Sequence, residues 1–147
     1  MALKNLSGRA ERTISAKPDE CYELLADVAR WPDWYPALRE VESQGDLIHV
    51  QANVFGMSLP FQAQVRLDPP TAVEVERVPY HPGDEEELSI RTSIAPDPGG
   101  SKVGAEFEAR VDVPRLLPLP PATGDRLAGG LLSALEKRLA EPAGQEG

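Results

Sequence analysis

The sequence predicts an α+β fold, in which an antiparallel sheet of about seven strands carries helices on one face. Three observations lead to this prediction. Apolar and polar residues alternate from Leu38 to Val113, which is the period of half-buried strands. A short segment with helical spacing precedes this region, and a longer one follows it. A run of strands between two helical segments favours a sheet with helices packed on one side.

The first elements are a strand and a short helix. Residues 9–15 alternate loosely and predict a strand. A helix is expected from Pro18, because proline suits the first turn and the acidic Asp19 and Glu20 favour the helix dipole. Pro32 and Pro36 then allow only a short second helix or turn. The apolar face of the first helix consists of Cys21, Leu24, Leu25 and Val28.

Six further strands are expected after residue 38. Turn residues at 44–46, 55–57, 68–70, 79–84 and 96–100 separate them, so the strands form an antiparallel meander. Several inward positions carry small side chains: Ala52, Ala63, Ala105 and Ala109. These would leave room for a bound molecule, or would let the final helix pack closely.

A proline-rich connector and a long helix end the chain. Residues 114–121 contain four prolines and predict a stiff extended segment. The helix is expected over residues 124–141, with residues 142–147 as a frayed tail of a single domain spanning 1–147. Gly129 and Gly130 weaken this helix and indicate close helix–sheet packing, a hinge or space for a ligand. The apolar stripe consists of Ala128, Leu131, Leu132, Leu135 and Leu139.

Charge and composition exclude several functions. The net charge of −9 over 147 residues disfavours nucleic acid and anionic membrane surfaces. No apolar run is long enough for a signal sequence or a membrane span, so we expect a cytoplasmic protein without stable membrane insertion. The only cysteine, Cys21, is expected to be buried, and no residue spacing predicts a metal or cofactor site. The oligomeric state stays open.

Few residues are candidates for acid–base chemistry. Asp27 is expected to brace the turn that follows it. His49 and His81 are expected at the surface, and His81 becomes an acid–base candidate, together with Tyr80, only if they border a cavity. The acidic run 84–87 is interpreted as a solvated loop. Cross-strand ion pairs are expected between two arginines and two acids: Arg91, Arg110, Glu106 and Glu108.

Aromatic residues are concentrated in one segment. Both tryptophans and one of the three tyrosines lie at Trp31, Trp34 and Tyr35, between prolines. Such rings each bury about 150–250 Å² and dominate the core or pocket they join. Two interpretations follow: the rings seal one end of the core, or they wall a cavity between the sheet and the last helix.

The aromatic segment also carries a family resemblance. The pattern Asp-x-x-x-Trp-Pro-x-Trp-x-Pro at residues 27–36, after a short helix, resembles the opening of START-like (SRPBCC) helix-grip domains, and within them the polyketide cyclase/dehydrase branch. A Leu-Pro-x-Pro-Pro segment at 117–121, before the last helix, extends the resemblance over nearly the whole chain. It implies a helix-grip order, β-α-α-β6-α, with the curved sheet wrapped around the C-terminal helix.

The leading functional hypothesis is binding of a small apolar or amphipathic molecule, such as a lipid, quinone or polyketide-like compound. The resemblance implies a cavity between the sheet and the C-terminal helix, and apolar walls with few polar groups suit it to such ligands. The segment 116–121 and the turn 55–57 are predicted gates. The predicted lining consists of Trp31, Trp34, Tyr35, Met57, Phe61, Ile90, Thr92, Phe107, Leu127, Leu131 and Leu135.

Two alternatives belong to other classes. The resemblance implies a cyclase or dehydratase, which would need inward polar groups to move protons. The sequence offers few: Tyr35, Thr92 and, if they border the cavity, Tyr80 or His81. The other alternative is a partner-binding module with a filled cavity, for which the acidic face of the last strand would be the surface to test. An inward dyad would favour the enzyme, an empty apolar cavity the carrier, and a filled core the module.

Overall fold

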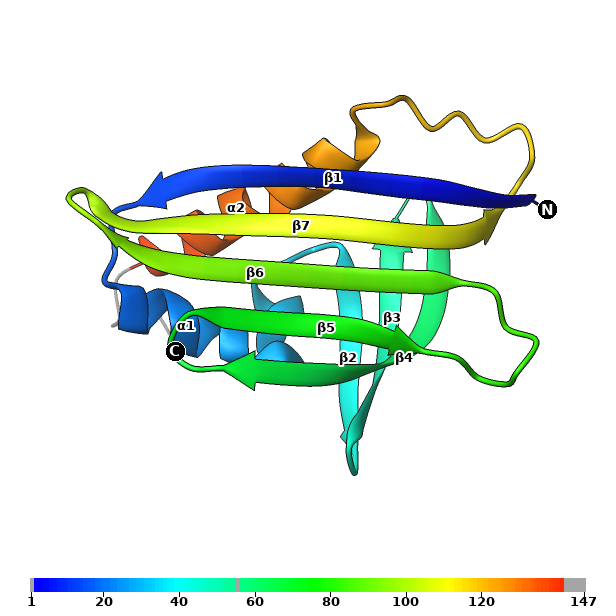
Figure 1. Ribbon diagram of the computed structural model, residues 1–147, viewed down its shortest axis with the longest axis horizontal. Helices are drawn as coiled ribbons and strands as arrows, with labels where there is room; N and C mark the ends of the chain where they lie inside the picture. The colour runs from blue at the N-terminus through cyan, green and yellow to red at the C-terminus, as the bar shows by residue number, and fades with distance from the viewer. Residues whose placement is uncertain (1, 55, 142–147) are drawn as a thin grey trace.

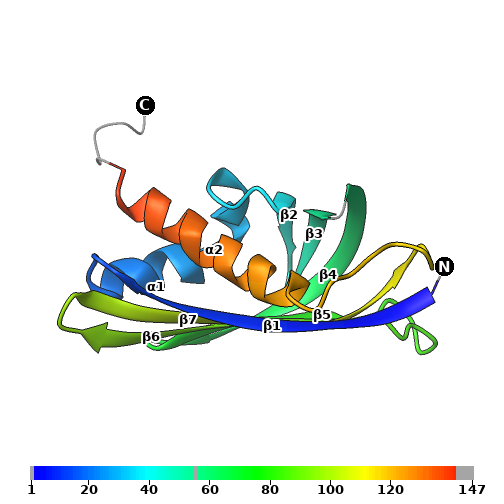
Figure 2. The same cartoon turned by 90° about the horizontal axis from the view of Figure 1, so that it is seen from above.

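The computed structural model describes residues 2–54 and 56–141, and shows a sheet with two helices on its concave face (Figures 1 and 2). The predicted frayed tail and Phe55 of one predicted gate lie outside these residues. The elements are β1 (Ala2–Ile14), α1 (Pro18–Ala26), the 3₁₀ helix η1 (Val28–Asp33), β2 (Leu38–Gln44), β3 (Leu47–Val54), β4 (Met57–Asp68), β5 (Ala72–Val78), β6 (Glu87–Asp97), β7 (Gly100–Val113) and α2 (Thr123–Leu139).

The strands form one antiparallel sheet of seven strands in the order β1-β7-β6-β5-β4-β3-β2. This confirms the predicted α+β architecture. The first strand begins at Ala2, earlier than the predicted residue 9. The early residues are extended because β7 offers them partners as far as Val113, which pairs with Ala2.

The predicted alternation fixes which side chains form the core. Residues at even positions in β3 and β6, and at odd positions in β5 and β7, face the helices and are largely buried. The helices bury the apolar stripes expected of them, with Leu25 of α1 and Leu131 and Leu135 of α2 at 0% exposure. Burial of these faces against one another is what holds the layers together.

Helix α2 crosses β1 at very short range. Gly8 of β1 and Gly124 in the first turn of α2 lie backbone against backbone, and a Cβ on either would overlap the other chain segment. The Asp125 carboxylate accepts a hydrogen bond from the backbone N–H of Arg9 at 2.9 Å beside this contact. The close approach therefore lies at Gly124. The interpretation of Gly129 and Gly130 as a close-packing site is wrong, because a Cβ there meets nothing within 4 Å.

The sheet bends sharply at β4. Figure 1 shows β2 and β3 running across the direction of β5, β6 and β7, with β4 curving from one direction to the other. The residues of β4 before Gln62 pair with β3, whereas the pairing with β5 begins at Gln62, opposite Val78. The β5–β6 ladder likewise ends at Glu76 and Ser89. A wedge therefore opens between β4 and β6, and residues 79–86 occupy the connection across it.

Candidate ligand cavity

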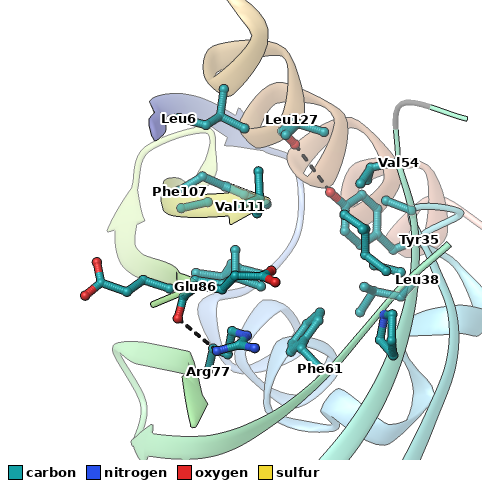
Figure 3. Close-up of a pocket in the computed structure, with 18 residues that line it drawn as sticks. Leu6, Tyr35, Leu38, Val54, Phe61, Arg77, Glu86, Phe107, Val111 and Leu127 are labelled. Carbon is teal, nitrogen blue, oxygen red and sulfur yellow. Dashed lines mark hydrogen bonds between the residues drawn. The ribbon is translucent and has the colours of Figure 1, made fainter. Parts of the chain in front are cut away.

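A cavity lies on the inner face of the sheet at this bend, beneath the first half of α2 (Figure 3). Its volume is about 80 Å³. Its lining comes from strands on both sides of the wedge, from α2 and from the segment after η1. The lining residues are Leu6, Tyr35, Ala37, Leu38, Ala52, Val54, Leu59, Pro60, Phe61, Arg77, Glu86, Glu87, Leu88, Ile90, Phe107, Ala109, Val111 and Leu127.

The deep wall of the cavity is apolar and closed to solvent. Tyr35, Phe61, Ile90 and Phe107 are each 3–6% exposed. Ile90 and Phe107 are direct cross-strand neighbours on β6 and β7, so their side chains lie on the same face. The wall is apolar because each strand contributes its inward row there, and the bend at β4 brings Phe61 round to face the other strands.

Five of the predicted site residues line this cavity: Tyr35, Phe61, Ile90, Phe107 and Leu127. The other six lie elsewhere: Trp31, Trp34, Met57, Thr92, Leu131 and Leu135. Thr92 and Leu131 show the reason. Each lies one step further along an element that contributes a lining residue, and each is fully buried in the core. The row of inward-facing residues on each element is thus longer than the cavity. Only one end of each row borders the cavity, and the rest lies in the core.

The aromatic segment serves both roles that the sequence allowed. Trp31 is fully buried, and its indole N–H donates to the carbonyl of Leu25 at 3.0 Å, which ties η1 to α1. The ring of Trp34 lies 5.7 Å from that of Trp31 and 6.1 Å from that of Tyr35, between centroids. Trp31 therefore seals the core, and Tyr35, at the other end of this packed group, reaches the cavity.

Tyr35 places a hydroxyl group at the cavity wall. This hydroxyl donates a long hydrogen bond, 3.5 Å, to the carbonyl of Leu127 (Figure 3). Burial raises the pKa of Tyr35 to about 12, because the phenolate would lose its hydration. At neutral pH the hydroxyl is therefore protonated and acts as a hydrogen-bond donor.

This raised pKa predicts a loss of stability in alkali. A group whose pKa is higher in the folded state stabilises the fold fully below its ordinary pKa, here 10.0, and loses that contribution as the pH rises toward about 12. We expect the free energy of unfolding, measured between about pH 9 and 12 where tyrosine ionises, to fall more steeply for the wild type than for Tyr35→Phe. Parallel curves for the two proteins would contradict this.

Arg77 is a site residue that the sequence analysis missed. Its guanidinium group borders the cavity opposite Tyr35 and lies beside Phe61 in Figure 3. It donates to the Asp84 carboxylate at 2.8 Å and to the carbonyl of Glu86 at 2.8 Å. The alternation along β5 could have predicted Arg77, because this residue continues the inward row of Val73 and Val75.

Asp84 is the buried partner of Arg77. Both side chains are only 6–7% exposed. The Arg77 hydrogen bond, helped by the backbone N–H groups of Tyr80 and Glu86, holds the pKa of Asp84 well below its usual range. The interpretation of residues 84–87 as a wholly solvated run is therefore wrong at Asp84. The acidic residues 84–87 were expected to stay in water because they lacked an evident cationic partner. Arg77 of β5 supplies that positive charge to Asp84.

The other candidate residues do not line this cavity. His81 is exposed, and its Nδ1 accepts the N–H of Gly83 at 3.2 Å. His49 is half-buried on β3. The Asp27 side chain makes no capping hydrogen bond at the start of η1, so the expected side-chain brace is wrong. The turn is held by the backbone carbonyl of Asp27, which accepts the N–H of Arg30 at 3.0 Å. Cys21 is buried, as predicted, and burial raises the pKa of its thiol.

Of the two arginines expected in cross-strand ion pairs, Arg91 forms such a pair with another acid, and Arg110 bonds to an amide side chain. Arg91 pairs with Glu74 of β5 at 3.2 Å. Arg110 donates to the side chain of Asn5 on β1 at 3.3 Å. Glu106 lies opposite Arg91 in the ladder, so the predicted face is correct although the partner differs.

The connector that was predicted as a gate is held at one end of the sheet. Lys4 of β1 donates to the carbonyls of Arg115 and Leu117 at 2.8 and 2.7 Å. Leu116 between them is 93% exposed. Figure 2 shows the connector passing over the N-terminal end of β1 before α2 begins.

Over residues 2–54 and 56–141, no group of three or more His, Cys, Asp or Glu side chains could hold a metal ion. Among the helices of that same part of the chain, none is long and apolar enough to cross a membrane.

Solved structures show that this fold occurs in known proteins. A START superfamily protein from Mycobacterium smegmatis is 18% identical and has a TM-score of 0.62, covering 91% of this chain and 95% of that one. The Zhui aromatase/cyclase from Streptomyces sp. R1128 is 16% identical with a TM-score of 0.61, covering 98% and 99%. The chain spans half the length of the di-domain ARO/CYC StfQ from the steffimycin biosynthetic pathway, which is 11% identical over 90% of this chain, with a TM-score of 0.69. The architecture is thus the helix-grip fold of START proteins, as the resemblance implied.

A family model narrows this class. The model described as "Polyketide cyclase / dehydrase and lipid transport" matches residues 14–136. The chain belongs to this family, and the family resemblance of the 27–36 pattern is confirmed. A search of curated protein sequences finds no match.

Proposed function

We propose that the protein binds a small apolar or amphipathic molecule, such as a lipid, quinone or polyketide-like compound, in the cavity between the bent sheet and α2. The observation that supports this proposal is the closed aromatic wall of Tyr35, Phe61 and Phe107 beneath α2. Removing apolar surface from water contributes about 25 cal/mol per Å², so such a wall favours an apolar guest.

The polar groups of the cavity suit an amphipathic ligand. Tyr35 and Arg77 present donors from opposite sides, and the rest of the deep wall is apolar. A ligand with a hydrogen-bond acceptor at one end could meet either donor, which would fix its orientation. The volume of about 80 Å³ is below the roughly 300–1,000 Å³ of pockets that enclose drug-sized ligands. The cavity therefore encloses one part of such a ligand, or it widens on binding.

Binding is tested with a neutral fluorescent probe, N-phenyl-1-naphthylamine, titrated into the purified protein. We expect Leu127→Arg to weaken binding by about tenfold or more, because it places a charge at the cavity wall. Leu67→Arg is the matched control, since Leu67 is 49% exposed on β4 and outside the cavity lining. Equal affinities of the two variants would contradict the proposal.

Native mass spectrometry of the protein from its own host would then name the ligand class. A co-purified apolar molecule, lost on denaturation and absent from Leu127→Arg, supports the proposal. A clean apo mass, together with no probe binding, would favour the alternative of a partner-binding module.

A cyclase or dehydratase is the second candidate. The observation that favours it is the pair of facing donors, because the Tyr35 hydroxyl and the Arg77 guanidinium could each polarise a carbonyl oxygen. The names of the Zhui and StfQ structures point to the same chemistry for those proteins. Incubation with polyketide-like chains distinguishes the two functions: a carrier returns the chain unchanged, whereas an enzyme releases a cyclised or dehydrated product and loses this activity in Tyr35→Phe.

A further inference from the structure

The wedge between β4 and β6 is a gap in the backbone of the sheet. Strand β5 continues to Val78, but its ladder with β6 ends at Glu76 and Ser89. Continued pairing would set Arg77 opposite Leu88. Strand β4 before Gln62 pairs with β3, and not with β5. Residues 79–86 form the loop that joins the end of β5 to the start of β6 at this wedge (Figure 1).

Side chains close the gap where backbone pairing stops. Arg77 reaches from β5 to the Glu86 carbonyl, just before β6, and to the Asp84 carboxylate in the loop. The ring of Tyr80 lies 5.5 Å from the guanidinium carbon of Arg77. On the other side of the wedge, the Gln62 side chain donates to the carbonyl of Pro79 at 3.0 Å. The loop is therefore fastened to both β4 and β5 by a few side-chain bonds.

The same side chains separate the cavity from the outer face of the sheet. Arg77, Glu86, Glu87 and Leu88 line the inner cavity. These four residues, together with Leu6 and Ala109, also line a hollow that reaches the outer face, where it includes outward residues such as Ser89. Arg77, one half of the pair with Asp84, thus lies between the two spaces.

We propose that residues 79–86 form a lid over this gap, that the Arg77–Asp84 pair is its latch, and that the ligand enters and leaves between β4 and β6 when the lid opens. The inference rests on the proposed function, since it concerns access to the same cavity. Opening breaks a small set of side-chain bonds and leaves the β5–β6 ladder intact, so it is a local event of the kind that loops undergo. This places access away from the predicted gates at 55–57 and 116–121.

The test is stopped-flow binding of N-phenyl-1-naphthylamine to the full chain. In Asp84→Asn the latch loses its carboxylate, whereas Arg77 keeps its place in the cavity wall and its hydrogen bond to the carbonyl of Glu86. We expect the association and dissociation rates both to rise by about tenfold or more, with the dissociation constant unchanged, because a gate changes rates and not the bound state. The matched control is Glu74→Gln, which removes the carboxylate from the Arg91–Glu74 pair on the outer face of β5 and β6. It should leave both rates unchanged.

The outcomes separate the lid from other roles. Unchanged rates in a folded latch variant would overturn the lid. A changed dissociation constant at a constant association rate would also overturn it, because Arg77 would then act by contacting the probe. If the wild type binds no probe, the proposed function fails and the lid with it. If the wild type binds the probe but the latch variant has the same rates as the control, the lid proposal fails and the proposed function stands.

A second measurement uses the wild type alone and does not depend on the folding of a variant. Hydrogen exchange of the wild type should show that the N–H groups of Tyr80 and Glu86, both bonded to Asp84, exchange faster than those of the β5–β6 ladder. Exchange of the two amides only together with the ladder would overturn the lid, since residues 79–86 would not open on their own.

Discussion

Replacing Gly8 or Gly124 by alanine is expected to destabilise the protein by about 3 kcal/mol or more, or to prevent folding. The two glycines bring β1 and the first turn of α2 together backbone against backbone. The atoms that an added methyl group would meet are backbone atoms, which cannot rotate away as a side chain would. The measurement is the free energy of unfolding in urea.

Two other glycines of the same helix provide the control. Gly129→Ala and Gly130→Ala place a methyl group where nothing lies within 4 Å. Each is expected to leave the stability unchanged or raise it by up to about 1 kcal/mol, because alanine is the better helix former. If Gly124→Ala were as well tolerated as Gly129→Ala, the close contact of α2 with β1 would be contradicted.

The second large effect is expected at the latch. Arg77→Met should lower the free energy of unfolding by about 3–5 kcal/mol, because it leaves the Asp84 carboxylate buried without its partner. The double variant Arg77→Met/Asp84→Asn should be more stable than this single variant, since no charge is then left unpaired. Urea unfolding of the three proteins at neutral pH gives the comparison, and a double variant less stable than Arg77→Met would contradict the pairing.

Acid adds an independent readout of the same pair. The folded pKa of Asp84 is lowered, so its contribution is fully present above its ordinary pKa of 3.8 and is lost as the pH falls below that value. The stability of the wild type should therefore fall more steeply below pH 3.8 than that of Asp84→Asn. Matching acid profiles of the two proteins would show that Asp84 carries no such contribution.

The fold was predictable because its signals are local and repeated. The alternation in β3, β6 and β7 determines which faces are buried, and it needs no knowledge of partners. The start of β1 was not predictable in the same way. Residues 2–8 alternate weakly, and they are extended because β7 pairs with them as far as Val113. A strand that depends on a distant partner carries little signal of its own.

The site was predictable only in part, for a related reason. Alternation shows that Phe61, Ile90 and Phe107 face inward, but it does not show where along an inward row a cavity ends. Thr92 satisfies the same pattern as Ile90 and lies in the core, where its hydroxyl donates to the carbonyl of Val73. The cavity lies where the sheet bends, and the bend is set by where ladders stop, which is a property of strand pairs.

The pairing of β1 with β7 also bears on how the chain reaches its fold. Within the part of the chain that the structure describes, β1 pairs only with β7, with Ala2 opposite Val113 and Ile14 opposite Ser101. A ribosome releases β1 long before β7 exists, and pairings across such a separation form slowly. Until then, the edge of β1 is free to pair with other chains. Folding during synthesis should therefore be completed only after residue 113 has emerged, and the nascent chain is most exposed to aggregation before that point.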